Sequence, residues 1–169
     1  MAPLLRRTWA LRGITPTLPI RARTHEKVSA IGALVVSPRR RRITLYLALH
    51  PGENIRGPYV LQFLRHLRRH LRGPLVLLWD SGKPHRHREV RHYLATHRHW
   101  HVVWLPPYAP ELQPQEQVWN HFKYGRLANF APDALPQICR AVWRELRRVA
   151  HRPALLKNLF RHSALPFRV

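Results

Sequence analysis

The chain has 169 residues and a mass of 20.1 kDa, a length typical of one domain. Hydrophobic residues make up 45% of the sequence, which suits a packed core and excludes a collagen-like or low-complexity chain. The charge is unbalanced, because 30 Lys and Arg accompany 8 Asp and Glu, and 26 of the 30 are arginines. A net charge of +22 favours a polyanionic partner, nucleic acid first, although a GC-rich genome or a membrane-surface role also produces arginine-rich chains.

A single cysteine, Cys139, excludes a disulfide framework and a four-cysteine zinc site. No stretch reaches the roughly 18 uncharged apolar residues of a membrane span. The first residues carry Arg6 and Arg7 but no long apolar run, so no secretory signal is recognised. We therefore expect a cytoplasmic, nucleoid-associated protein with no membrane contact.

Residues 6–23 are expected to be loop-rich or a short hairpin, because they contain Gly13, Pro16 and Pro19. Beyond them, strand and helix patterns alternate. The expected elements are strands over 27–36 and 43–49, a helix between Gly57 and Gly73, a strand over 75–79, a helix over 88–96, a strand over 100–105, and helices over 115–127, 135–149 and 154–162.

This order predicts one α/β domain over residues 1–169, with a mixed sheet flanked by helices. The apolar run Leu75–Trp79 is expected to be a strand buried on both faces. Trp104, Trp119 and Trp143 are expected in the core. In open α/β sheets functional residues gather at the carboxyl ends of strands, and Asp80 lies directly after such a strand.

Two acidic residues stand in positions that suit catalysis. Asp80 ends an apolar strand, and Glu116 lies in the first turn of a helix that follows the next strand. Neighbouring carboxylates repel, and a divalent cation such as Mg²⁺ relieves that repulsion while leaving positions for phosphate oxygens. The alternative is structural: Asp80 as a turn or cap residue, and Glu116 as a favourable charge at a helix start.

The segment from Val103 to Lys123, VWLPPYAPELQPQEQVWNHFK, resembles the block that carries the third catalytic acid of mariner-superfamily DDE transposases, in the form found in bacterial insertion sequences. Ala109 stands where that family usually has Ser, and Gln113 where it usually has Asn. The matching positions are Pro106, Pro107, Tyr108, Pro110, Glu111, Leu112, Pro114, Glu116 and Trp119.

A second block, LVLLWDSGKPHR, resembles the strand and loop that carry the family's second acid, here Asp80, followed by His85 and Arg86. Asp80 and Glu116 are 36 positions apart, in agreement with the family layout. The resemblance implies an RNase H-like fold, Mg²⁺ or Mn²⁺ held by Asp80 and Glu116, and cleavage and joining of DNA strands.

The resemblance also leaves one catalytic position unmatched. In the family the first Asp ends a strand shortly before an Arg-Thr-Trp stretch, which matches residues 7–9 here. The only acids before Asp80 are Glu26 and Glu53, in a different context. We therefore expect a catalytic domain that lacks its first strand, the first Asp and the amino-terminal helix-turn-helix DNA reader.

Other side chains have weaker roles in this interpretation. His85 would orient phosphate or metal-bound water, or cap the following helix. Tyr108 would stack on a base or pack its own loop. His97, His99 and His101 alternate, which suits a metal site less well than a solvated basic edge. The remaining expected contacts to the DNA backbone are Arg39, Arg40, Arg41, Arg42 and Lys123.

The sequence therefore predicts a DDE-type transposase domain that acts on DNA, as a homodimer on DNA, and that is inactive as this chain. One alternative is a catalytically dead basic DNA-binding remnant of a mobile element. Another is a general RNA-binding or nucleoid protein, which would have no use for Asp80 and Glu116 in this motif.

Overall fold

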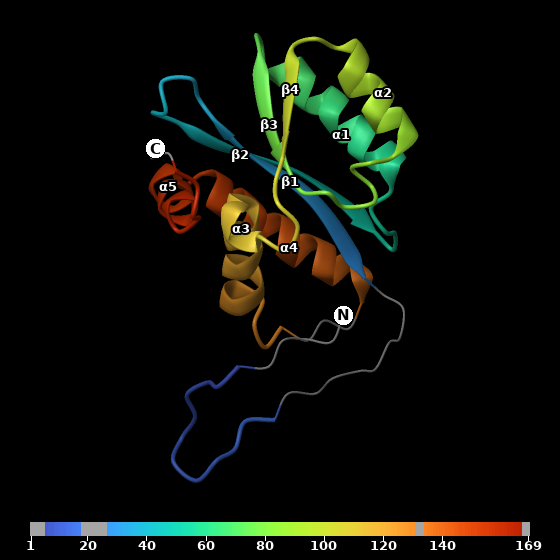
Figure 1. The fold of residues 1–169 in the computed structure, drawn as a ribbon. Coiled ribbons are helices and arrows are strands. Elements are labelled where there is room, and N and C mark those ends of the chain that lie inside the picture. The colour runs from blue at the N-terminus through green and yellow to red at the C-terminus, as the bar shows by residue number, and fades with distance from the viewer. Residues whose placement is uncertain (1–5, 18–26, 131–133, 167–169) are drawn as a thin grey trace.

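The structure, a computed structural model, describes residues 6–17, 27–130 and 134–166. Strands occupy the middle of the molecule, with α1 and α2 on one side and α3, α4 and α5 on the other (Figure 1). The elements are β1 (Val28–Val36), β2 (Ile43–Pro51), α1 (Gly57–His70), β3 (Leu75–Trp79), α2 (Arg88–Thr96), β4 (Trp100–Trp104), η1 (Pro110–Leu112), α3 (Pro114–His121), η2 (Phe122–Arg126), α4 (Leu135–Ala150) and α5 (Pro153–Arg161).

β1 and β2 form an antiparallel hairpin whose two faces are both covered. Side chains alternate between the faces of a strand, so Ile31 and Ala33 pack against the α1–α2 core, whereas Leu34 and Val36 pack against the core of α3, α4 and α5. The hairpin is therefore the shared wall of both hydrophobic cores.

β3 and β4 form a parallel pair, with α2 as the crossover between them. Leu77 and Val102 pack against the α1–α2 core, but on the opposite face Val76 is 67% exposed and Val103 is 47% exposed. The expectation that the run Leu75–Trp79 is buried on both faces is wrong. Helices α3, α4 and α5 cover the β1–β2 hairpin, and their core contains no residue of this parallel pair.

The α/β class is as expected, but the strands form two separate two-stranded sheets, β1–β2 and β3–β4. Among the described strands, none pairs with both β1 and β3. Both sheets nevertheless contribute side chains to the same core beneath α1 and α2, so they lie in one layer. The layer is therefore interrupted between the two sheets.

The helices follow the predicted apolar spacing. In α1, Pro58 occupies the first turn, and Val60, Leu64 and Leu67 are buried along one face. The helix expected over 115–127 is shorter: α3 ends at His121, and a π-helical turn follows it. Gly125 in this turn has φ −101° and ψ −106°, outside the helical region, which explains the early end.

Glu145 in α4 offers a test of packing, because it is a buried charge, 6% exposed. Both of its carboxylate oxygens accept hydrogen bonds from Arg148, at 2.7 and 2.9 Å. We expect Glu145→Ala to lower the free energy of unfolding by about 1–3 kcal/mol, measured by urea denaturation. The matched control Arg144→Ala removes an exposed partner at 3.9 Å and should cost less than about 0.5 kcal/mol. Equal losses for the two variants would contradict the importance of the buried pair.

Candidate active site around Asp80

Asp80 lies directly after β3, at the end where β4 also finishes. The backbone N–H of Leu105, which follows β4, donates to the carbonyl oxygen of Trp79 at 2.7 Å, so the pairing continues to the edge of the site. The carboxyl ends of both parallel strands therefore place the chain after Asp80 beside the chain after β4.

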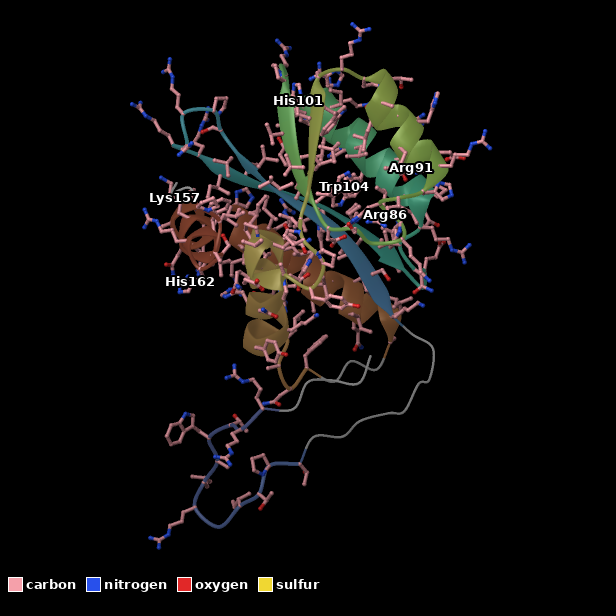
Figure 2. The ribbon with its side chains drawn as sticks, in the orientation of Figure 1. Arg86, Arg91, His101, Trp104, Lys157 and His162 are labelled. Atoms are coloured by element: carbon pink, nitrogen blue, oxygen red, sulfur yellow. The ribbon has the colours of Figure 1, made fainter. Side chains whose placement is uncertain are left out.

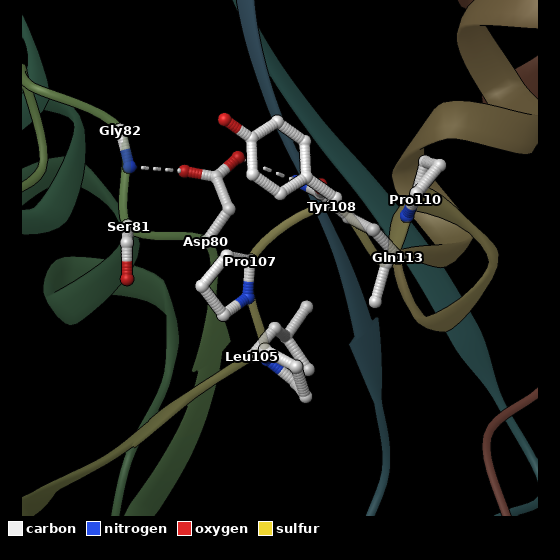
Figure 3. Close-up of a pocket in the computed structure, with 10 residues that line it drawn as sticks. Asp80, Ser81, Gly82, Leu105, Pro107, Tyr108, Pro110 and Gln113 are labelled. Atoms are coloured by element: carbon white, nitrogen blue, oxygen red, sulfur yellow. Dashed lines mark hydrogen bonds between the residues drawn. The ribbon is translucent and has the colours of Figure 1, made fainter.

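Hydrogen bonds hold the Asp80 carboxylate on both oxygens. The backbone N–H of Gly82 donates to Oδ1 at 2.9 Å, and His85 Nδ1 lies 2.7 Å from the same oxygen. Gln113 Nε2 donates to Oδ2 at 3.3 Å (Figure 3). A Cβ at Gly82 would lie 2.9 Å from Oδ1, so a larger residue at this position would displace the carboxylate.

The environment favours the ionised form of Asp80. Partial burial raises the pKa of the carboxyl. This rise is outweighed by effects that lower the pKa: the N–H of Gly82, the charge of His85 and the hydrogen bonds from His85 and Gln113. The net effect places the pKa below its ordinary value of 3.8. Asp80 is therefore an anion at neutral pH in a chain of large positive charge.

A pocket of about 360 Å³ opens beside Asp80 (Figure 3). Its other walls come from the loop after β4, and they are mostly apolar. Tyr108 lines the pocket with a fully exposed side chain and a left-handed backbone, φ 58°. A bulky residue in this region costs about 1–3 kcal/mol, and such strain persists only where the surrounding structure imposes it. The lining residues are Asp80, Ser81, Gly82, Leu105, Pro106, Pro107, Tyr108, Ala109, Pro110 and Gln113.

Glu116 lies in the first turn of α3, as predicted, but it does not line this pocket. Gln113 connects the two acids, since its side chain donates to Asp80 and its carbonyl oxygen accepts the backbone N–H of Glu116 at 2.9 Å. The residue before Glu116, Gln115, is 8% exposed, and its amide has no hydrogen-bond partner among the described residues. It packs on Gly32 of β1, where a Cβ would lie 2.7 Å from the Gln115 amide nitrogen.

His85 and Arg86 lie beside the ring systems at the end of the parallel pair. The His85 ring packs on Trp79 with centroids 4.2 Å apart, and Arg86 lies 5.9 Å from the centroid of Trp104 (Figure 2). His85 does not cap α2, because the N-cap residue is His87 and no side chain caps that end. Trp104 is 42% exposed and Trp143 is 46% exposed, so the expectation that these two are core residues is wrong.

The other expected DNA contacts lie apart from the pocket. The side chains of Arg39, Arg40, Arg41 and Arg42 are exposed on the β1–β2 turn, and Lys123 is exposed on η2. His97, His99 and His101 form no metal-binding group with other described residues. The sequence did not identify Gln113 as a hydrogen-bond partner of Asp80. The only signal in the sequence that could have pointed to Gln113 was its position in the motif.

The chain matches the family described as DDE superfamily endonuclease over residues 2–136, most of its length. It therefore belongs to this family. No curated protein matches the sequence. Within the described residues, no helix is both long enough and apolar enough to cross a membrane.

Two solved structures share the fold. The Mos1 transposase paired-end complex with left transposon end has 20% sequence identity and a TM-score of 0.59, over 96% of this chain and 52% of that chain. The Mos1 strand transfer complex has 18% identity and a TM-score of 0.56, over 98% and 52%. The expected RNase H-like α/β fold is thereby confirmed. The chain spans about half the length of these transposase chains.

The hydrogen bonds of Asp80 predict a measurable pKa. The chain has two aspartates, Asp80 and Asp133, so carboxyl ¹³C labelling of aspartate gives two resonances to titrate by NMR. We expect Asp80 to titrate below 3.8, and His85→Ala to raise its pKa by removing a positive charge and a hydrogen bond. The exposed His92 provides the matched control, since His92→Ala should leave the titration unchanged.

The same shift predicts the pH dependence of stability. A carboxyl whose folded-state pKa is lowered stabilises the fold above its unfolded pKa, and this contribution is lost as the pH falls through the folded value. The stability difference between the wild type and His85→Ala should therefore narrow in acid. A difference that widens below pH 3.8 would contradict this assignment.

Proposed function

We propose that this chain is part of the catalytic domain of a DDE-type transposase, of the bacterial insertion-sequence form, that hydrolyses DNA phosphodiesters and transfers the cut strand. The observation that carries this proposal is the ionised Asp80 at the end of β3, beside an open pocket, in a member of the DDE superfamily endonuclease family. Asp80 and Glu116 are the proposed catalytic acids.

The pocket suits a hydrated divalent cation, Mg²⁺ or Mn²⁺. The Asp80 side chain is 42% exposed, and from the described residues Oδ2 accepts one hydrogen bond, at 3.3 Å, so a hard oxygen donor is available. Mg²⁺ binds one or two carboxylates and keeps several waters. Asp80 and Glu116 would hold the ion, which when bound lowers the pKa of water and stabilises the leaving oxygen of a phosphodiester. His85 and Gln113 would keep the Asp80 carboxylate oriented.

The first of the three acids of a DDE site has no matched residue in this sequence. Glu53 lies in the loop between β2 and α1 and accepts a hydrogen bond from the Tyr59 hydroxyl of α1. Glu26 lies outside the described residues. β1 and β3 pair with different partners and not with each other. This interruption supports a domain organisation in which a further strand, carrying the first acid, pairs between them.

DNA is the proposed partner, and the enzyme would act on it as a homodimer in the nucleoid. Tyr108 lines the pocket, and Arg86 lies over the ring of Trp104, whereas the arginines of the β1–β2 turn and Lys123 would hold the backbone at other points. By their descriptions, one Mos1 structure is a paired-end complex with a left transposon end and the other is a strand transfer complex, which is consistent with this partner. A catalytically dead DNA-binding remnant is the second candidate, favoured by the unmatched first acid.

DNA binding should be dominated by phosphate contacts. Each phosphate neutralised contributes about −0.9 to the slope of log K against log salt on duplex DNA. Arg39→Ala combined with Arg41→Ala should make the slope shallower by about 1.8 if both arginines contact phosphate. The control pair Arg69→Ala and Arg91→Ala removes the same charge from exposed positions on α1 and α2. Salt-independent binding, or strong preference for one duplex sequence, would refute this interpretation.

Cleavage should require a third acid. We expect purified 1–169 not to nick supercoiled DNA with Mg²⁺ or Mn²⁺, because losing one electrostatic contact to the transition state typically costs about 10²–10³ in rate and losing a metal ligand costs more. An extended chain with an added strand carrying Asp should cleave, and Glu116→Ala in that chain should abolish cleavage. Cleavage by 1–169 that disappears in Asp80→Ala would show that two acids suffice.

A further inference from the structure

Tyr108 is an aromatic residue whose side chain is fully exposed to solvent in this fold. Its side chain is 101% exposed, whereas tyrosines in folded proteins usually bury part of their ring. Two roles were expected for Tyr108, stacking on a base or packing its own loop. The exposure of the side chain excludes the second role. The ring offers both faces to the solvent.

The loop holds this bare ring in place. Pro106 and Pro107 precede Tyr108, and Pro110 begins η1 two residues after it, so ring closure fixes φ at three nearby positions. Tyr108 itself has φ 58°, a conformation that few bulky residues adopt. A loop so restricted loses little conformational entropy when a flat ligand docks on the ring.

The ring lines the same pocket as Asp80 (Figure 3). The pocket volume of 360 Å³ falls in the range of roughly 300–1,000 Å³ found for small-ligand sites. Leu105 and the three prolines make its walls mostly apolar, and the Asp80 carboxylate supplies the charge. An aromatic platform, apolar walls and one carboxylate match a nucleotide, whose base is flat and whose phosphate would meet a cation at Asp80.

A paired base cannot use this platform, because both of its faces are stacked on neighbouring base pairs in the duplex. We propose that Tyr108 is a stacking site for an unpaired nucleobase, next to the phosphate that lies at Asp80. The site then takes DNA that is melted or frayed at the cleavage point. This inference rests on the proposed function, since it assumes that the phosphate at Asp80 belongs to DNA.

Trp104 and Arg86 form a second exposed pair of an aromatic ring and an arginine, and Trp104 is the last residue of β4. Trp104 stacks on Trp79, with centroids 6.2 Å apart and planes 6° apart, and is 42% exposed. Arg86 lies 5.9 Å from the centroid of Trp104 and is also exposed (Figure 2). Aromatic rings interspersed with arginine are the usual composition of surfaces that hold single strands, because rings stack on bases while arginine binds the backbone.

The test compares two duplexes of identical length and phosphate number, one fully paired and one with a short mismatched bubble containing 2-aminopurine. Dissociation constants come from anisotropy titrations of the 1–169 chain at fixed salt, and 2-aminopurine fluorescence reports stacking. We expect the bubble to bind about tenfold tighter, in line with roughly 5- to 150-fold per base stacked on an aromatic side chain, and its fluorescence to be quenched.

Variants locate the effect on the ring. Tyr108→Ala should remove the preference for the bubble and leave binding of the paired duplex within about twofold, because the phosphate contacts persist. Tyr108→Phe should retain the preference, since it keeps the ring. Tyr124→Ala is the matched control, because Tyr124 is 49% exposed but does not line the pocket. Circular dichroism checks that each variant remains folded.

The outcomes separate the two proposals. Equal binding of both duplexes, with normal salt dependence, would overturn the stacking site and leave DNA binding standing. Persistence of the bubble preference in Tyr108→Ala, or its loss in Tyr108→Phe, would also overturn the stacking site. Absence of binding to either duplex would overturn the proposed function together with this inference.

Discussion

The apolar face of α1 is the feature on which the rest of this molecule depends. The two pairs of strands do not hydrogen-bond to each other, so no ladder joins them. What places them in one layer is their common packing against a core that contains Val60, Leu64 and Leu67. The relative position of β1 and β3, and hence of α3 and Asp80, is therefore fixed by side-chain packing, which is less directional than a strand ladder.

The candidate site follows from this arrangement because its parts come from both sides of the interruption. Asp80 follows β3, whereas α3 packs with its neighbours against the β1–β2 hairpin. Gln113 spans the two, with its side chain on Asp80 and its backbone in the first turn of α3. A single amide thus connects the strand-end acid to the helix that carries Glu116, and its hydrogen bond belongs to the forces that keep Asp80 ionised.

The sequence predicted the strands and most α-helices closely, because apolar periodicity and Gly-Pro boundaries are local signals. It missed the short turn η1 and the end of α3 at His121. It did not predict that Val76 and Trp104 are exposed, because burial depends on which layer the distant helices cover. The placement of Asp80 at a strand end was predictable, but its partner Gln113 was not, since that contact joins residues 33 positions apart. The bare ring of Tyr108 was likewise undecided, because loop packing carries no periodic signal.

Gly32 shows how an absent side chain determines the placement of a functional helix. A Cβ at position 32 would lie 2.7 Å from the Gln115 amide nitrogen, so this side chain of α3 packs against the backbone of β1. A substitution here would meet that amide before any other atom and press on the turn that presents Glu116. The same Cβ would lie 2.9 Å from Leu47 Cδ2, so a larger side chain at position 32 has to displace both Leu47 and the Gln115 amide. A residue that has no chemistry of its own thus takes part in setting the position of the helix that carries Glu116.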